Sequence, residues 1–149
     1  MKLKLQIYEH YLQIINEREA MLQKILDDLK ESGANETKST AGDKHETALA
    51  MLQIEQENTR IQLQELLATK AAFQKLDPAL SAPIVVNGSL IKTNRGYLFM
   101  SAALGKAAIG NISVMSLSPQ SPLGQKLMGL KPGEAAFINA VEYVIENIE

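Results

Sequence analysis

Two carboxylates three residues apart, Asp43 and Glu46, are the side chains of this sequence whose types and spacing best suit chemistry. On a helix or at its start, positions three apart share a face, so both groups can converge on one cation. The same spacing fits a capping box, in which Asp43 caps a helix and Glu46 completes the arrangement. The two interpretations are compatible, because a capped helix start also fixes where the carboxylates point.

The composition excludes several other kinds of site. The chain has no cysteine, which rules out disulfides and thiolate metal or nucleophile sites. A net charge of −2 and an aromatic content of 5% predict neither a general basic field for nucleic acid nor a base-stacking surface. The sequence contains no signal-peptide core and no apolar run long enough to span a membrane, so we expect a cytoplasmic protein with no membrane partner.

The elements that must position the two carboxylates are long helices. Residues 3–32 and 44–76 contain no Gly or Pro, and their apolar residues recur at helical spacing. Ser32-Gly33 indicates the end of the first helix, with Gly33 in the left-handed position past its last turn. Two helices of roughly 45 Å, joined by a short loop, predict an antiparallel coiled-coil hairpin over residues 1–76 with its tip at about 33–46. A parallel coiled-coil dimer is the structural alternative.

The apolar stripe on each helix follows an alternating four-three rhythm that is typical of a coiled-coil seam. Polar residues interrupt it, Glu19 in the first helix and Gln56, Thr59 and Lys70 in the second. A smaller stripe on the second helix is expected to meet the C-terminal domain or another chain. The seam residues are Tyr8, Leu12, Ile15, Leu22, Leu26 and Leu29, and Leu49, Leu52, Leu63, Leu66 and Phe73; the smaller stripe is Ile54, Ile61, Ala68 and Ala72.

The last third of the chain has a different composition and predicts a second domain. Residues 77–83, with two prolines, indicate a linker before a domain over 84–149. We expect one short helix, capped by Ser121, on a small antiparallel sheet, which makes the fold class α+β. The expected strands are 89–93, 97–101, 106–109, 112–117, 135–138 and 141–148.

Two stretches of the sequence resemble motifs of one known family, the bacterial Gre transcript-cleavage factors. Their hairpin-tip motif, Gly-Asp-x-x-Glu-Asn-Ala, is similar to Gly42-Asp43-Lys44-His45-Glu46-Thr47-Ala48. Their C-terminal signature is similar to Ser121-Pro122-Leu123-Gly124-Gln125-Lys126-Leu127-Met128-Gly129, followed by Gly133-Glu134. The order and separation of the motifs also match, so the resemblance covers nearly the whole chain.

The resemblance implies an accessory factor of transcription elongation rather than an enzyme. It implies an FKBP-like C-terminal domain that docks on RNA polymerase, with Ser121, Pro122, Leu123 and Gly124 as partner-binding residues. The hairpin would enter the secondary channel and reach the 3′ end of backtracked nascent RNA. Asp43 and Glu46 would act as catalytic residues by holding a Mg²⁺ ion shared with the polymerase, so the metal binds only in that complex. A monomer is favoured.

The sequence leaves two alternatives open. Thr47 stands where the family usually has Asn, and Glu134 stands where it usually has Asp. A Gre-like regulator that binds the channel without cleaving RNA is therefore the closest competitor. A coiled-coil adaptor or dimerisation protein with no link to polymerase is the alternative from another class.

Overall fold

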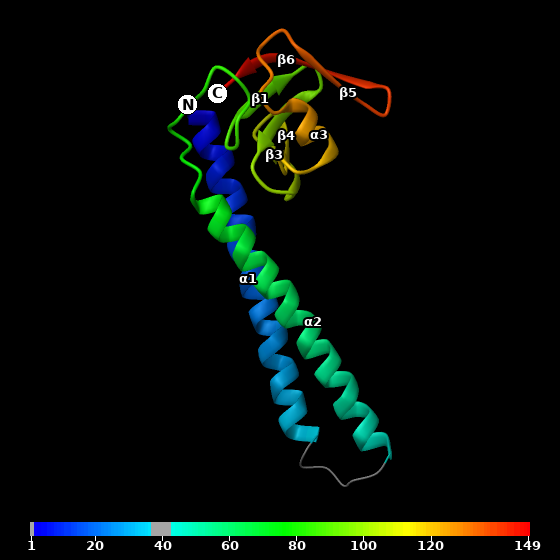
Figure 1. Ribbon diagram of the computed structural model, residues 1–149. Helices are drawn as coiled ribbons and strands as arrows, with labels where there is room; N and C mark the ends of the chain where they lie inside the picture. Colours follow the sequence, from blue (N-terminus) through cyan, green and yellow to red (C-terminus); the bar gives the residue numbers. More distant parts are fainter. Residues whose placement is uncertain (1, 37–42) are drawn as a thin grey trace. The chain divides into compact units, whose positions relative to one another are not determined.

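Two long helices begin the chain, because residues with high helix propensity and a continuous apolar stripe extend over both Gly- and Pro-free runs. The computed structural model describes residues 2–36 and 43–149, with helix α1 at Lys2–Glu36 and helix α2 at Asp43–Gln74 (Figure 1). The chain divides into two compact units, Met1–Leu12 with Ala72–Glu149, and Gln13–Ala71.

Within Gln13–Ala71, α1 and α2 form an antiparallel pair (Figure 1). Ile15, Leu26 and Thr59 are buried at their interface, and the other seam residues of this unit are partly buried. The predicted seam is therefore confirmed. The smaller stripe is exposed, since 61% of Ile54 and 43% of Ile61 are accessible, and what these residues meet stays a prediction.

The polar residues that interrupt the seam find partners across it or within their own helix. The Lys70 ammonium donates to the Glu19 carboxylate at 2.7 Å, which joins α2 to α1 by an ion pair. The Gln56 side-chain amide donates to the backbone oxygen of Leu29 at 3.2 Å, and the Thr59 hydroxyl donates to Glu55 on its own helix. Because partly buried polar groups need partners, the two contacts between the helices, Lys70 with Glu19 and Gln56 with Leu29, favour one register.

The expectation that α1 ends at Gly33 is wrong. The helix continues to Glu36, and Gly33 does not take a positive φ. Glycine costs only about 1 kcal/mol in a helix interior. Gly33 is partly buried against α2, where an added Cβ would lie 3.5 Å from the Gln56 amide nitrogen. We infer that packing against α2 carries the helix past its glycine.

A six-stranded sheet with one short helix follows the hairpin. The strand order is β3-β4-β2-β1-β6-β5. The predicted strands and helix are confirmed, and each strand end lies within one residue of its expected place. Their bounds are β1 Leu90–Thr93, β2 Gly96–Met100, β3 Gly105–Ile109, β4 Ile112–Leu117, α3 Pro122–Leu127, β5 Ala135–Ile138 and β6 Val141–Ile148.

The sheet departs from the expected antiparallel arrangement at one pair. β2 and β4 run parallel, with Tyr97 opposite Val114 and Met100 opposite Leu117. After β2 the chain passes to the sheet edge as β3, and the turn at Gly110 returns β4 into the gap between them. Local turn signals predict the β3–β4 hairpin but not which strand it lies beside, because strand order depends on contacts distant in sequence.

The core of this unit joins aromatic residues of the helix ends to the sheet. Phe99 on β2 lies 6.3 Å from Tyr11 and 6.0 Å from Phe73 between ring centroids. All three residues are at most 1% exposed. The Tyr11 hydroxyl donates to the backbone oxygens of Gly105 and Val114 at 2.8 and 3.3 Å. The first turns of α1 and the end of α2 thus share one core with the sheet. Among the described residues, no helix is both long and apolar enough to cross a membrane.

Candidate functional site

The predicted carboxylate pair lies at the turn end of the hairpin. α1 ends at Glu36 and α2 begins at Asp43, so Asp43 and Glu46 both belong to the first turn of α2. Glu46 is exposed to solvent. The Asp43 side chain and residues 37–42 lie outside the described residues, and the convergence of the two carboxylates remains a prediction. Residues 2–36 and 43–149 contain no group of three or more side chains suited to holding a metal ion.

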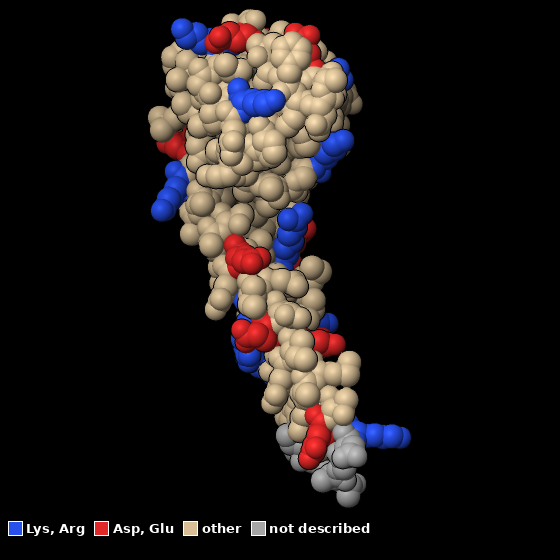
Figure 2. Space-filling model, turned by 45° about the vertical axis from the view of Figure 1, so that its right-hand side comes forward, with Lys and Arg blue, Asp and Glu red and all other residues tan. Residues whose placement is uncertain are grey.

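The charges on the visible face are mixed. Figure 2 shows acidic and basic side chains interspersed along the helices, with no continuous basic surface on that side. This distribution agrees with the net charge of −2. Neither feature supplies the sequence-independent attraction to phosphates on which nucleic-acid binding usually depends.

The C-terminal signature forms the short helix α3 and its cap. Ser121 has extended backbone angles, and its hydroxyl oxygen accepts from the Gly124 amide at 3.0 Å while donating to the Ser118 carbonyl at 2.7 Å. Pro122 follows as the first helical residue, where its missing N–H costs nothing. Gly129 has φ +83°, a left-handed conformation that suits glycine just past a helix end.

Three of the four predicted partner-binding residues have clear roles within the fold. Ser121 is the helix cap, and Leu123 is a core residue that is 8% exposed. At Gly124 a Cβ would lie 2.0 Å from the Ser118 carbonyl oxygen, so no other residue fits without a backbone shift. Pro122 is the exposed member of the set. The four residues lie together in the structure. Ser121, Leu123 and Gly124 stabilise the fold, and Pro122 is exposed where a partner could contact it.

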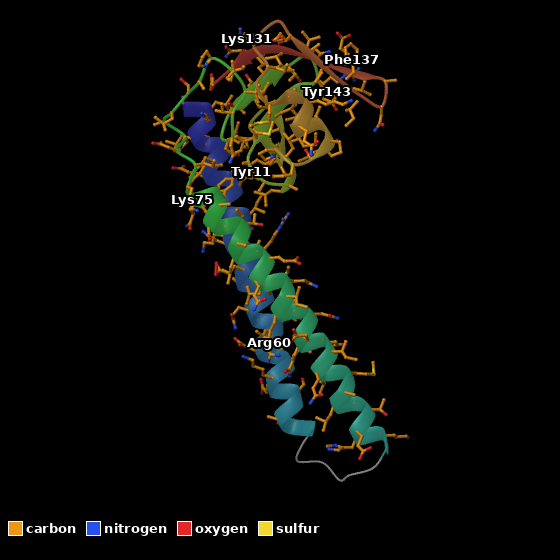
Figure 3. All side chains as sticks on the ribbon, in the orientation of Figure 1. Tyr11, Arg60, Lys75, Lys131, Phe137 and Tyr143 are labelled. Atoms are coloured by element: carbon orange, nitrogen blue, oxygen red, sulfur yellow. The ribbon has the colours of Figure 1, made fainter. Side chains whose placement is uncertain are left out.

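Two exposed apolar side chains near α3 were not predicted from the sequence. Met128, which caps the end of α3, is 37% exposed, and Phe137 on the edge strand β5 is 56% exposed. The Lys126 ammonium on α3 donates to the Phe137 backbone oxygen at 2.6 Å and so ties the helix to that strand. Figure 3 labels Phe137 on β5 and Tyr143 on the neighbouring β6. Strand alternation could have predicted this exposure, because Phe137 follows the buried Ala136.

A comparison of the chain with protein-family models, with curated proteins and with solved structures finds no match.

Proposed function

We propose that this chain is a Gre-like accessory factor of bacterial RNA polymerase. The sheet and α3 form an FKBP-like domain that docks on the polymerase, and the hairpin inserts its tip into the secondary channel. One observation supports this most: both sequence motifs occupy the places that such a factor requires. Asp43 and Glu46 begin α2 at the turn of a two-helix hairpin, while Ser121 to Gly129 form a capped helix in the separate sheet-containing unit.

In the proposed chemistry, the chain supplies two carboxylate ligands to a magnesium ion. Magnesium prefers oxygen ligands and is usually held by one or two carboxylates together with waters and phosphates. Asp43 and Glu46 would supply two such ligands to an ion placed beside the metal that the polymerase keeps. A pair of metals can orient the attacking water and stabilise the leaving oxygen while backtracked RNA is hydrolysed. The polymerase is the enzyme, and this chain completes its site.

The proposed docking surface begins at Pro122, which is exposed at the start of α3. Met128 and Phe137 add apolar area on the same unit, and exposed aromatic residues are enriched in protein interfaces. Ser121 and Gly124 act indirectly, since they hold Pro122 in place through the cap.

The proposal is tested by mixing the full chain with a stalled elongation complex. Co-elution with the polymerase and Mg²⁺-dependent release of short 3′ RNA fragments are the expected results. Pro122→Asp should weaken co-elution, whereas Lys92→Asp on the exposed side of β1 is a matched control that should not. Wild-type protein that never co-elutes with polymerase would refute the docking proposal.

A second candidate is the Gre-like regulator that blocks the channel without cleavage. Thr47 and Glu134, which replace residues usual in the family, favour it. Co-elution without RNA release at any Mg²⁺ concentration would select this candidate.

A coiled-coil adaptor is the candidate from another class, and the exposed residues Ile54 and Ile61 on α2 favour it. Such an adaptor would self-associate and would not bind polymerase.

A further inference from the structure

The turn that joins β5 to β6 places an alanine in a backbone conformation that suits glycine. Asn139 and Ala140 have φ of 50° and 63°, and among the described residues they alone combine a positive φ with a side chain. A two-residue hairpin turn of this kind favours Asn-Gly, because glycine adopts a positive φ without steric cost. The Cβ of Ala140 makes this conformation strained, and such strain clusters at functional sites.

Contacts at its base hold the β5–β6 hairpin in place. The Asn94 side-chain amide donates to the Glu142 carbonyl at 3.3 Å, and its oxygen accepts from the Val144 amide at 2.8 Å. The Arg95 guanidinium donates to the same Glu142 carbonyl at 3.0 Å and lies over the Tyr143 ring, 5.9 Å from its centroid. The turn between β1 and β2 thus fastens β6, and the hairpin projects from the sheet with its strained turn at the free end (Figure 1).

The hairpin presents Phe137 to solvent. This residue is 56% exposed, and it is the one exposed aromatic among the described residues, which include all four Tyr and three Phe. Its neighbour Ala136 is buried in the core, so the two faces of β5 have different surroundings. Ala140 is also exposed, three residues further along the hairpin. Exposed aromatic residues are enriched in protein interfaces, which makes the hairpin a candidate contact surface.

The surroundings of β5 favour contact through side chains rather than addition of another strand. β5 lies at an edge of the sheet, and edge strands can pair with a further strand through their free backbone groups. The Phe137 carbonyl points away from β6, however, and already accepts from the Lys126 ammonium at 2.6 Å. The helix α3, which carries Lys126, packs against β5. Both contacts obstruct strand addition along this edge.

Building on the proposed docking to polymerase, we propose that the β5–β6 hairpin is a preformed contact arm. The Phe137 ring enters an apolar pocket of the polymerase, and the Ala140 methyl group packs at the rim of that pocket. Glycine at position 140 would relieve the strain but remove the methyl group. The strain in the free chain is therefore offset only when the arm contacts its partner.

The test measures the Kd of the full chain for RNA polymerase together with its melting temperature. Phe137→Ala should weaken binding at least about tenfold, as is usual for an aromatic anchor in a pocket. Ala140→Gly should weaken binding about two- to fourfold, the effect of losing one packed methyl group, without lowering the melting temperature. A variant that only disturbed folding would lower both. Leu80→Ala, which removes a side chain that is 68% exposed in the same unit, is the matched control and should bind like wild type.

The outcomes separate this arm from the docking proposal itself. Wild-type protein that does not bind polymerase would overturn both. If Pro122→Asp weakens binding while Phe137→Ala and Ala140→Gly bind like wild type, docking stands and the contact arm is refuted. A lower melting temperature in Ala140→Gly would contradict the strain at this turn. Loss of self-association in Phe137→Ala, with polymerase binding unchanged, would assign the arm to a second copy of the chain and overturn the proposal.

Discussion

Replacing Gly124 by Ala tests whether the C-terminal signature is built into the fold. The new Cβ would lie 2.0 Å from the Ser118 carbonyl oxygen, 2.9 Å from the Ser121 hydroxyl oxygen and 3.0 Å from the Pro119 Cα. The nearest of these atoms belongs to the backbone, so a rotamer change cannot relieve the clash. The turn from Ser118 to Ser121 must move instead, and the cap of α3 moves with it.

The loss in the free energy of unfolding follows from the contacts that such a movement breaks. The Ser121 hydroxyl would lose its bonds to Ser118 and Gly124, at about 1 kcal/mol each, and overpacking a closed site adds about 1–3 kcal/mol. We therefore expect a loss of about 3–5 kcal/mol, which lowers the melting temperature by roughly 10 °C in a chain of this size.

Near-ultraviolet circular dichroism isolates the unit concerned, because all four Tyr and three Phe lie within Met1–Leu12 and Ala72–Glu149. Gly33→Ala is the matched control, since its Cβ meets only the Gln56 amide nitrogen at 3.5 Å. That change should stabilise the hairpin by up to about 1 kcal/mol, measured by far-ultraviolet circular dichroism. A Gly124→Ala variant that melts like wild type would refute the reasoning.

Three further predictions concern the hairpin and its junction with the sheet. Leu26→Ala should cost about 2–5 kcal/mol in urea unfolding and Leu66→Ala less, because Leu26 is 5% exposed while Leu66 is only partly buried; no loss in either variant would contradict the assigned seam. A double-mutant cycle on Glu19 and Lys70 should give a coupling of about 1 kcal/mol, and exchanging the two residues should restore most of it. Burial raises the pKa of Tyr11 above its ordinary value of 10.0, so the unfolded chain releases this proton at a lower pH than the folded chain. The stability that Tyr11 contributes therefore begins to fall as the pH passes its ordinary pKa and is lost as the pH rises through the raised pKa of the folded state. Tyr11→Phe should flatten this alkaline loss in melts at increasing pH, and an unchanged slope would contradict the assignment.

Features that depend on local spacing were predictable. The seam follows from the four-three rhythm, and the strands follow from alternation and from turns such as Gly110-Asn111. The cap at Ser121 follows from the proline after it. These signals lie within a few residues of the structure that they specify.

Features that depend on distant contacts were not predictable. Glu19 and Lys70 pair with each other from opposite helices. In the sequence, each residue alone looks like an interruption of the apolar seam. Buried Lys4 donates its hydrogen bond to Leu80, which is 76 residues away. Gly33 shows the converse error, since its local signal for a helix end yields to packing against α2. The proposed roles of Asp43 and Glu46 involve a partner, so the chain alone could not reveal them.

The most direct test of the proposed function measures RNA fragments released by tip variants in a stalled elongation complex. Asn caps a helix about as well as Asp, so Asp43→Asn should leave the melting temperature and polymerase binding almost unchanged. An amide brings no charge to a hard dication, so Asp43→Asn and Glu46→Gln should each reduce Mg²⁺-dependent cleavage strongly. Because the pair acts as one unit, the double variant should lose far less than the two single losses combined. Cleavage at the wild-type rate by both single variants would contradict the account, because the carboxylates would then only cap α2.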